Sequence, residues 1–179
     1  MFRHFVFLLS LLFLASPVTA QPASQKILAK VLAYHQKHAD CDYQIDELSD
    51  DDLMVLNKQS SIVMVLCITG AYQGSSVFYM ADNYDGEISV WTQTFATTDD
   101  GKKFTGTDSL TSADFDRKTK SITAFYKSRG IGDCGSTSTY TWSGNRFYLV
   151  EAGFMPCCAV TDEKSGSPQC KKFRKLREQ

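Results

Sequence analysis

The segment that ends at Cys134 carries residue types that could perform chemistry. Three glycines fall within residues 130–135, which predicts positive backbone dihedral angles or a close approach of two chain segments. A free thiol at Cys134 could act as a nucleophile, with backbone amides stabilising an oxyanion. That reaction needs a nearby base, and beyond His4 the chain holds only His35 and His38. We therefore predict a disulfide at Cys134 and a protein that is not an enzyme.

The same segment carries charged residues that could bind a ligand. Lys127 and Arg129 precede the glycines, and Asp133 lies among them. An exposed Arg129 would offer a forked pair of donors to a carboxylate or a phosphate. Alternatively, Arg129 and Asp133 pair with each other or with backbone groups and close the turn. Both interpretations are open here, and Lys127, Arg129 and Asp133 are the candidate ligand-binding residues.

Metal and carboxylate sites have little support in the sequence. The six cysteines include no C-x-x-C pair, and only two histidines follow residue 20. Residues 46–52 hold five acids but no glycine for a calcium loop, which favours a solvated acidic loop with a short turn starting at Ser49 or Asp50. Glu151 has no identifiable second catalytic carboxylate. We expect no metal and no cofactor.

Residues 1–20 have the layout of a secretory signal peptide. A short basic start precedes the apolar run of residues 5–15, and small residues at 18–20 place cleavage near Ala20. The apolar run is too short to be a good membrane span. The sequence predicts an exported protein without a membrane span, periplasmic or secreted. The 19 Lys and Arg against 20 Asp and Glu lack the basic excess of a nucleic-acid binder.

An amphipathic helix is expected over residues 24–39, at the start of a single domain comprising residues 21–179. Apolar residues recur at helical spacing, and Ser24 is a plausible N-cap. His35 and His38 lie near the helix C-terminus, where we expect them to cap the helix or face solvent. The residues that define the periodicity are Ile27, Leu28, Val31, Leu32 and His35.

The chain from Leu53 onward has a sequence pattern typical of β-strands. Short apolar or alternating runs are separated by turn residues, among them Asp85-Gly86, Asp100-Gly101 and Ser143–Asn145. This pattern predicts a mainly β fold, a single antiparallel β domain built as a sandwich or an open barrel. The basic end, residues 171–177, is expected to dock as a final helix or strand, or to contact a polyanion. The expected strands include residues 54–56, 62–68, 77–80, 88–91, 121–126, 137–142 and 146–150.

Four segments resemble domain-of-unknown-function family 1176, a family of bacterial exported proteins. The resemblance covers roughly residues 41–160, and its most specific part is the K-x-R-G-x-G-D-C-G run. This chain has Gln73 where the family element C-x-x-G-A-Y-N ends in asparagine. The resemblance implies a compartment and a scaffold but no mechanism. The four segments are residues 66–72, 126–135, 142–149 and 155–158.

An even number of cysteines in an exported chain indicates disulfides, and six cysteines allow 15 full pairings. The family's M-P-x-C element matches Cys158 and leaves Cys157 as an addition. With that element, the expected pairs are Cys41 with Cys67, Cys134 with Cys158, and Cys157 with Cys170.

These features favour an exported, non-catalytic binding protein of the bacterial envelope. Most of its strand aromatics would lie in the core, and an exposed subset would form a binding face. Its partner would be an envelope protein or polymer, and we expect a monomer. The alternative is an inhibitor of a cell-wall hydrolase such as lysozyme, in which residues 129–135 plug an active site.

Overall fold

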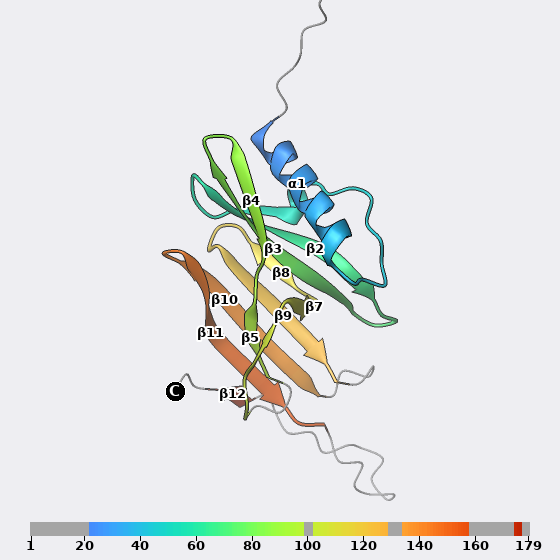
Figure 1. Ribbon diagram of the computed structural model, residues 1–179. Helices are drawn as coiled ribbons and strands as arrows, with labels where there is room; N and C mark the ends of the chain where they lie inside the picture. The colour runs from blue at the N-terminus through green and yellow to red at the C-terminus, as the bar shows by residue number, and fades with distance from the viewer. Residues whose placement is uncertain (1–21, 99–101, 129–133, 158–173, 177–179) are drawn as a thin grey trace, which may run out of the picture.

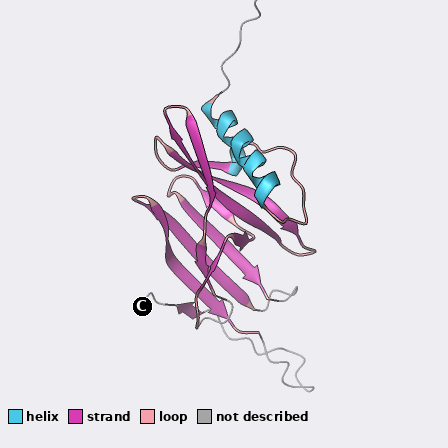
Figure 2. Ribbon diagram, in the orientation of Figure 1, coloured by secondary structure: helices cyan, strands magenta, loops and turns pink. Residues whose placement is uncertain are grey.

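The computed structural model describes residues 22–98, 102–128, 134–157 and 174–176. It confirms a mainly β fold with one N-terminal helix (Figures 1 and 2). Two antiparallel sheets face each other, and the helix lies on the outer side of the first sheet. Of the two expected architectures, the structure is therefore the sandwich.

Helix α1 spans Ala23–His38, one residue earlier than predicted at each end. The prediction of Ser24 as N-cap is wrong, because the helix begins after Pro22 and Lys26 donates its backbone hydrogen bond to the Pro22 carbonyl. Ser24 therefore lies inside the first turn. The buried stripe of the helix is Ile27, Leu28, Val31 and His35.

The first sheet follows a short 3-10 turn, Asp50–Asp52, which confirms the short turn expected to start at Ser49 or Asp50. Ser49 and Asp52 form a reciprocal capping box there. Neighbouring strands pair in the order β1-β2-β3-β4, and β7 pairs with the other half of the long strand β3. The strands are β1 Leu53–Val55, β2 Ser60–Thr69, β3 Gly74–Tyr84, β4 Glu87–Thr92 and β7 Ser109–Thr111.

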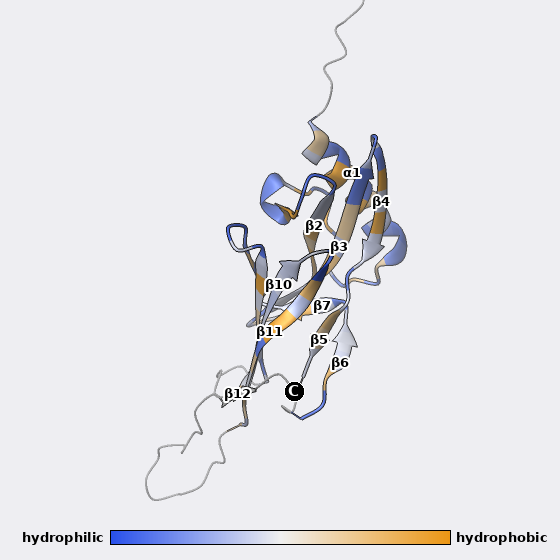
Figure 3. Cartoon of the chain, turned by 90° about the vertical axis from the view of Figure 1, so that its left-hand side faces the viewer, coloured by the Kyte–Doolittle hydropathy of each residue, from blue (hydrophilic) through white to orange (hydrophobic). Residues whose placement is uncertain are grey.

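The second sheet has the order β12-β11-β10-β9-β8. A separate two-stranded ribbon, β5 Phe95–Thr97 with β6 Thr105–Thr107, lies at the end of the molecule away from α1 (Figure 3). The basic chain end contributes strand β12, so the strand form of the expected final element is confirmed. The strands of the second sheet are β8 Asp114–Asp116, β9 Ser121–Lys127, β10 Gly135–Ser143, β11 Arg146–Met155 and β12 Arg174–Leu176.

Two apolar clusters hold these layers together. The first lies between α1 and the first sheet, where Val31 packs with strand residues such as Val63 and Tyr79. The second lies between the two sheets, where Phe78 meets Ile122 and Tyr140. Because residues alternate along β3, the strand supplies Tyr79 to the first cluster and Phe78 to the second.

Side chains from the second sheet also bind backbone carbonyls of the first. The Arg117 guanidinium donates to the carbonyls of Asp51 and Leu53, and the Lys120 ammonium donates to the Leu56 carbonyl at 2.6 Å. These bonds attach the sheets to each other at the end near β1 and β8.

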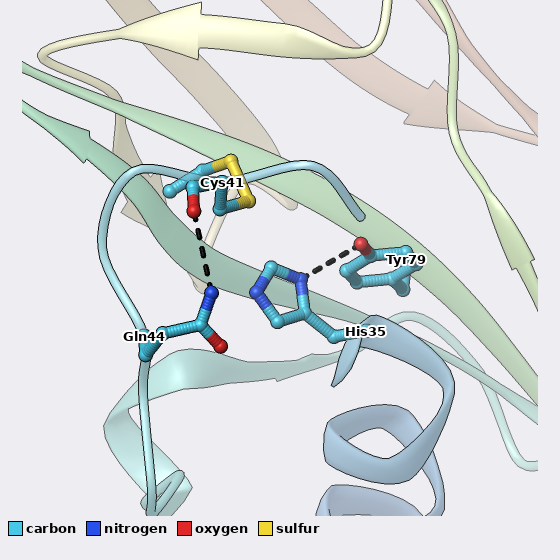
Figure 4. Close-up of a disulfide and its surroundings, with 5 residues drawn as sticks. His35, Cys41, Gln44 and Tyr79 are labelled. Carbon is cyan, nitrogen blue, oxygen red and sulfur yellow. Dashed lines mark hydrogen bonds between the residues drawn. A yellow bond between two sulfur atoms is a disulfide. The ribbon is translucent and has the colours of Figure 1, made fainter. Parts of the chain in front are cut away.

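The disulfide between Cys41 and Cys67 is confirmed, with the two Cα atoms 4.9 Å apart. Cys67 is the extra residue of a bulge, since the register of β2 on β3 shifts between Leu66 and Ile68. The Cys67 carbonyl accepts a hydrogen bond from the Tyr43 amide instead. The bulge and the disulfide together fix the segment that follows α1 to the sheet (Figure 4).

The expectation that His35 caps the helix or faces solvent is wrong. His35 is 3% exposed, and its Nδ1 lies 2.8 Å from the Tyr79 hydroxyl (Figure 4). It occupies the position four residues after Val31, so it continues the buried stripe toward the sheet. Burial raises the pKa of Tyr79 to about 12, with the charge of Asp108 adding to that shift, so the hydroxyl stays neutral as a partner.

The burial of His35 makes stability depend on pH. Desolvation lowers the pKa of His35 below its ordinary value of 6.5, so the unfolded chain binds the proton more readily than the folded protein. Stability is therefore full above about pH 6.5 and falls as the pH drops toward the folded-state pKa. We expect urea midpoints between about pH 8 and pH 5 to fall more steeply for the wild type than for His35→Gln. Equal slopes would contradict this role of His35.

Candidate functional site

Two segments that carried the family resemblance meet in space at the end of the sheets opposite Arg117. The turn after β2, which includes Tyr72 and Gln73, lies against the end of β9 at Tyr126 and Lys127. Together they line a hollow of about 290 Å³. Tyr72 is 73% exposed and Tyr126 is 41% exposed, so two aromatic rings are open to solvent there.

Gln73 joins the two segments because its side-chain amide forms two hydrogen bonds with the backbone of Lys127. Its Nε2 donates to the Lys127 carbonyl at 3.1 Å, and its Oε1 accepts from the Lys127 amide at 2.9 Å. The turn that presents Gln73 is tight, since the Gly70 amide donates to the Gln73 carbonyl and a Cβ on Gly70 would lie 2.7 Å from that oxygen. The residue that departs from the family pattern thus anchors β9.

A backbone hydrogen bond joins the two ends of the glycine-rich segment, residues 128–135, just beyond Lys127. The Ser128 amide donates to the Cys134 carbonyl at 3.0 Å, so these ends lie side by side. A Cβ added to Gly135 would lie 2.0 Å from the Tyr126 carbonyl oxygen. The close approach predicted from the glycines is therefore confirmed at Gly135.

The disulfide of Cys134 is confirmed, but its predicted partner is wrong. Cys134 bonds Cys157, with the Cα atoms 4.3 Å apart, and this also overturns the predicted pair of Cys157 with Cys170. The reason is strand register: Gly135 pairs with Met155, so the position opposite Cys134 is Pro156, and Cys157 lies one residue beyond it whereas Cys158 lies two residues beyond it. Cys158 and Cys170 lie outside the described residues. Cys134 is buried and bonded, so it is not a free thiol.

Of the three candidate ligand-binding residues, the structure places Lys127. It lies half-buried at the end of β9, with its ammonium 6.0 Å from the Phe125 ring centroid. Arg129 and Asp133 lie outside the described residues, so both interpretations of their roles stay predictions. In the part of the chain that the structure describes, no three His, Cys, Asp or Glu side chains gather as a metal-binding group.

A larger cleft of about 400 Å³ adjoins the hollow, and Tyr126 lines both. The cleft exists because the side chains on the inner face of the second sheet become smaller toward this end of the sheet. Near Ile122 and Tyr140 large side chains fill the space between the sheets, whereas Ala124, Ser136 and Ser138 are too small to do so. The lining residues are Thr97, Thr105, Gly106, Thr107, Ser109, Leu110, Thr111, Ala124, Tyr126, Ser136 and Ser138.

No sequence motif predicts this cleft. Its serines and threonines come from the four strands β5, β6, β7 and β10, and none of them lies in a segment that carried the family resemblance. One local pattern does indicate it. Alternation along the strand places Ser136 and Ser138 on the same face as Tyr140, and a filled core would need larger side chains at those two positions.

The model of the family described as "Protein of unknown function (DUF1176)" matches residues 12–167. This chain belongs to the DUF1176 family. The match is longer than the stretch of residues 41–160 over which the motifs showed the resemblance.

This DUF1176 chain is also similar to "Uncharacterized protein YpfG" of Escherichia coli strain K12, with 25% identity over 107 residues. The matched residues are 60% of this chain but 30% of that relative, so the chain spans less than a third of its length. No solved structure matches the chain. Among the described residues of this DUF1176 member, no helix is long and apolar enough to cross a membrane.

Proposed function

We propose that this protein is a non-catalytic binding protein of the bacterial envelope that takes its ligand in the cleft and the adjoining hollow. The observation that carries the proposal is the meeting of two family segments at Tyr126. One segment brings Tyr72 and Gln73, the other brings Tyr126 and Lys127, and the hydroxyl-lined cleft continues from them. Ligand sites are concave surfaces with a few convergent polar groups, and this region has that form.

The chemistry of the lining supports binding rather than catalysis. The described residues that line the cleft and the hollow are serines, threonines, glycines and alanines, with Leu110, Gln73, Lys127 and the two exposed tyrosines. Acid–base catalysis most often uses a histidine or a carboxylate, and the described residues lining the cleft and the hollow include neither, only tyrosines and one lysine among the groups that can exchange a proton.

Two disulfides support a location outside the cytoplasm, where such bonds form and persist. The signal-peptide pattern of residues 1–20 supports export to the periplasm or the medium, with cleavage near Ala20. The partner would then be an envelope protein or polymer, bound by a monomer.

Capture from an envelope extract tests this function. The immobilised mature chain should retain a component that Tyr126→Ala loses and Tyr148→Ala keeps. Tyr148 is the matched control because it is 42% exposed, similar to Tyr126, but lies on the opposite face of the same sheet. Melting curves would confirm that both variants fold. Equal capture by both variants, or no capture by the wild type, would contradict the proposal.

The closure of the glycine-rich segment favours hydrolase inhibition as a second candidate. Both ends of this segment are held, through the Ser128–Cys134 hydrogen bond and the disulfide to Cys157. A segment with fixed ends loses less conformational entropy when it enters an active site. Lysozyme activity measured with increasing protein would fall if this candidate is right and stay constant if it is wrong.

A further inference from the structure

We infer that the cleft binds a neutral carbohydrate chain, with Tyr126 stacking against a sugar ring. This inference rests on the proposed function, because it names the class of ligand for the same site. It is argued from the hydroxyl groups of the cleft, the absence of charge among its described lining residues, and the exposed aromatic rings beside it.

The hydroxyls of the cleft divide into bonded and available groups. Thr107 donates to the Ser109 carbonyl at 3.0 Å, and Thr111 shares a hydrogen bond with Ser75. Within the described chain, the hydroxyls of Thr97, Thr105 and Ser136 line the cleft with no hydrogen-bond partner. A hydroxyl both donates and accepts, so a row of them complements a ligand that also carries hydroxyls.

The charge of the cleft excludes other common ligands. None of the described lining residues is an acid or a base, whereas phosphates and carboxylates are bound by arginine, lysine or helix N-termini. A volume of about 400 Å³ suits a small-molecule site, but such sites are mostly apolar and this one is lined mainly by hydroxyls. A neutral, polyhydroxylated ligand fits both observations.

Aromatic rings flank the hydroxyls on two sides. Tyr126 lines the cleft where it joins the hollow, and Phe104, which is 49% exposed, lines a small hollow that shares Thr97, Ser136 and Ser138 with the cleft. The face of an aromatic ring carries partial negative charge and attracts the polarised C–H groups on one face of a pyranose. Rings on both sides of Ser136 and Ser138 suit a chain of sugars better than a single sugar.

Isothermal titration of the folded mature chain with neutral glucose, galactose, mannose and N-acetylglucosamine oligosaccharides tests the inference. At least one series should bind, and its affinity should change little with added salt because the oligosaccharides carry no charge. Tyr126→Ala should weaken binding by about tenfold or more, whereas Tyr126→Phe should keep the affinity within about threefold because the ring remains.

Removal of threonine hydroxyls from the cleft is an independent test of the same inference. The double variant Thr97→Val and Thr105→Val keeps side-chain shape and should weaken binding by about fivefold or more. Thr139→Val makes the same change on the opposite face of β10 and should bind like the wild type. Tyr148→Ala is the corresponding control for Tyr126→Ala.

The outcomes separate this inference from the proposed function. If no neutral oligosaccharide binds, or if binding survives both Tyr126→Ala and the double threonine variant, the carbohydrate inference is wrong. If envelope capture still depends on Tyr126 while neutral oligosaccharides fail to compete, the binding function stands with a protein or charged polymer as its ligand. If capture does not depend on Tyr126, the proposed site itself is wrong.

Discussion

Gly135→Ala is expected to lower the free energy of unfolding by about 3 kcal/mol or more. The added Cβ would lie 2.0 Å from the Tyr126 carbonyl oxygen and 3.2 Å from the Lys127 Cα, and neither backbone atom can rotate away. The strands β9 and β10 would have to separate where the hollow and the cleft meet. At about 2–4 °C per kcal/mol for a chain of this size, the melting temperature should fall by about 6–12 °C.

Gly144→Ala is the matched control. Gly144 has a φ of 67° in the β10–β11 turn, but a Cβ there meets nothing within 4 Å. The backbone conformation alone should cost about 1–2 kcal/mol. If the two variants melt together, the close approach of Gly135 to β9 is not the reason for this glycine.

Removing the Cys134–Cys157 disulfide is expected to cost about 3–4 kcal/mol, because the bond closes a loop with a sequence separation of 23. The double variant Cys134→Ser and Cys157→Ser should therefore unfold at lower denaturant than the wild type. It should also bind less well at Tyr126, since the ends of β9 and β10 lose their attachment to the segment after β11.

The choice of partner for Cys134 is tested with two single variants. Peptide mapping without reduction should find Cys134 bonded in Cys158→Ser and not bonded to Cys158 in Cys157→Ser. Recovery of a Cys134–Cys158 bond from the wild-type protein would contradict the Cys134–Cys157 disulfide. The pair of variants is needed because the two adjacent cysteines fall in one peptide.

Patterns within short segments of the sequence predicted those turns, helices and strands that depend mainly on interactions between residues close in sequence. Asp85-Gly86 specifies a tight hairpin because both residues adopt positive φ, 52° and 89°, in the turn between β3 and β4. The helix was predictable from its apolar spacing within one residue at each end. The strand expected over residues 121–126 is β9, in which the alternation is clear: Ile122 and Ala124 are buried and Thr123 between them is exposed.

The errors came from features that depend on contacts distant in sequence. His35 was expected to cap the helix or face solvent because it lies near the helix C-terminus, although its position in the apolar stripe indicated burial. The missing information was its partner Tyr79, 44 residues away. Cys134 was paired with Cys158 because the family's M-P-x-C element matches Cys158, and the choice between adjacent cysteines depends on where β11 ends against β10. The cleft arises from small residues on several strands, so it cannot be predicted from the pattern of any single segment.

The arrangement of the two sheets has a consequence for how the chain acquires its fold. The helix and the first sheet come from residues 23–111, and β8 to β11 come from residues 114–155. Each half has its own disulfide, 41 with 67 and 134 with 157, and neither bond joins the halves. A chain exported from its N-terminus can therefore complete the helix-covered cluster and oxidise its first cysteine pair before the second half emerges. Under the proposed export, the four cysteines of these two disulfides would emerge in the order in which they pair.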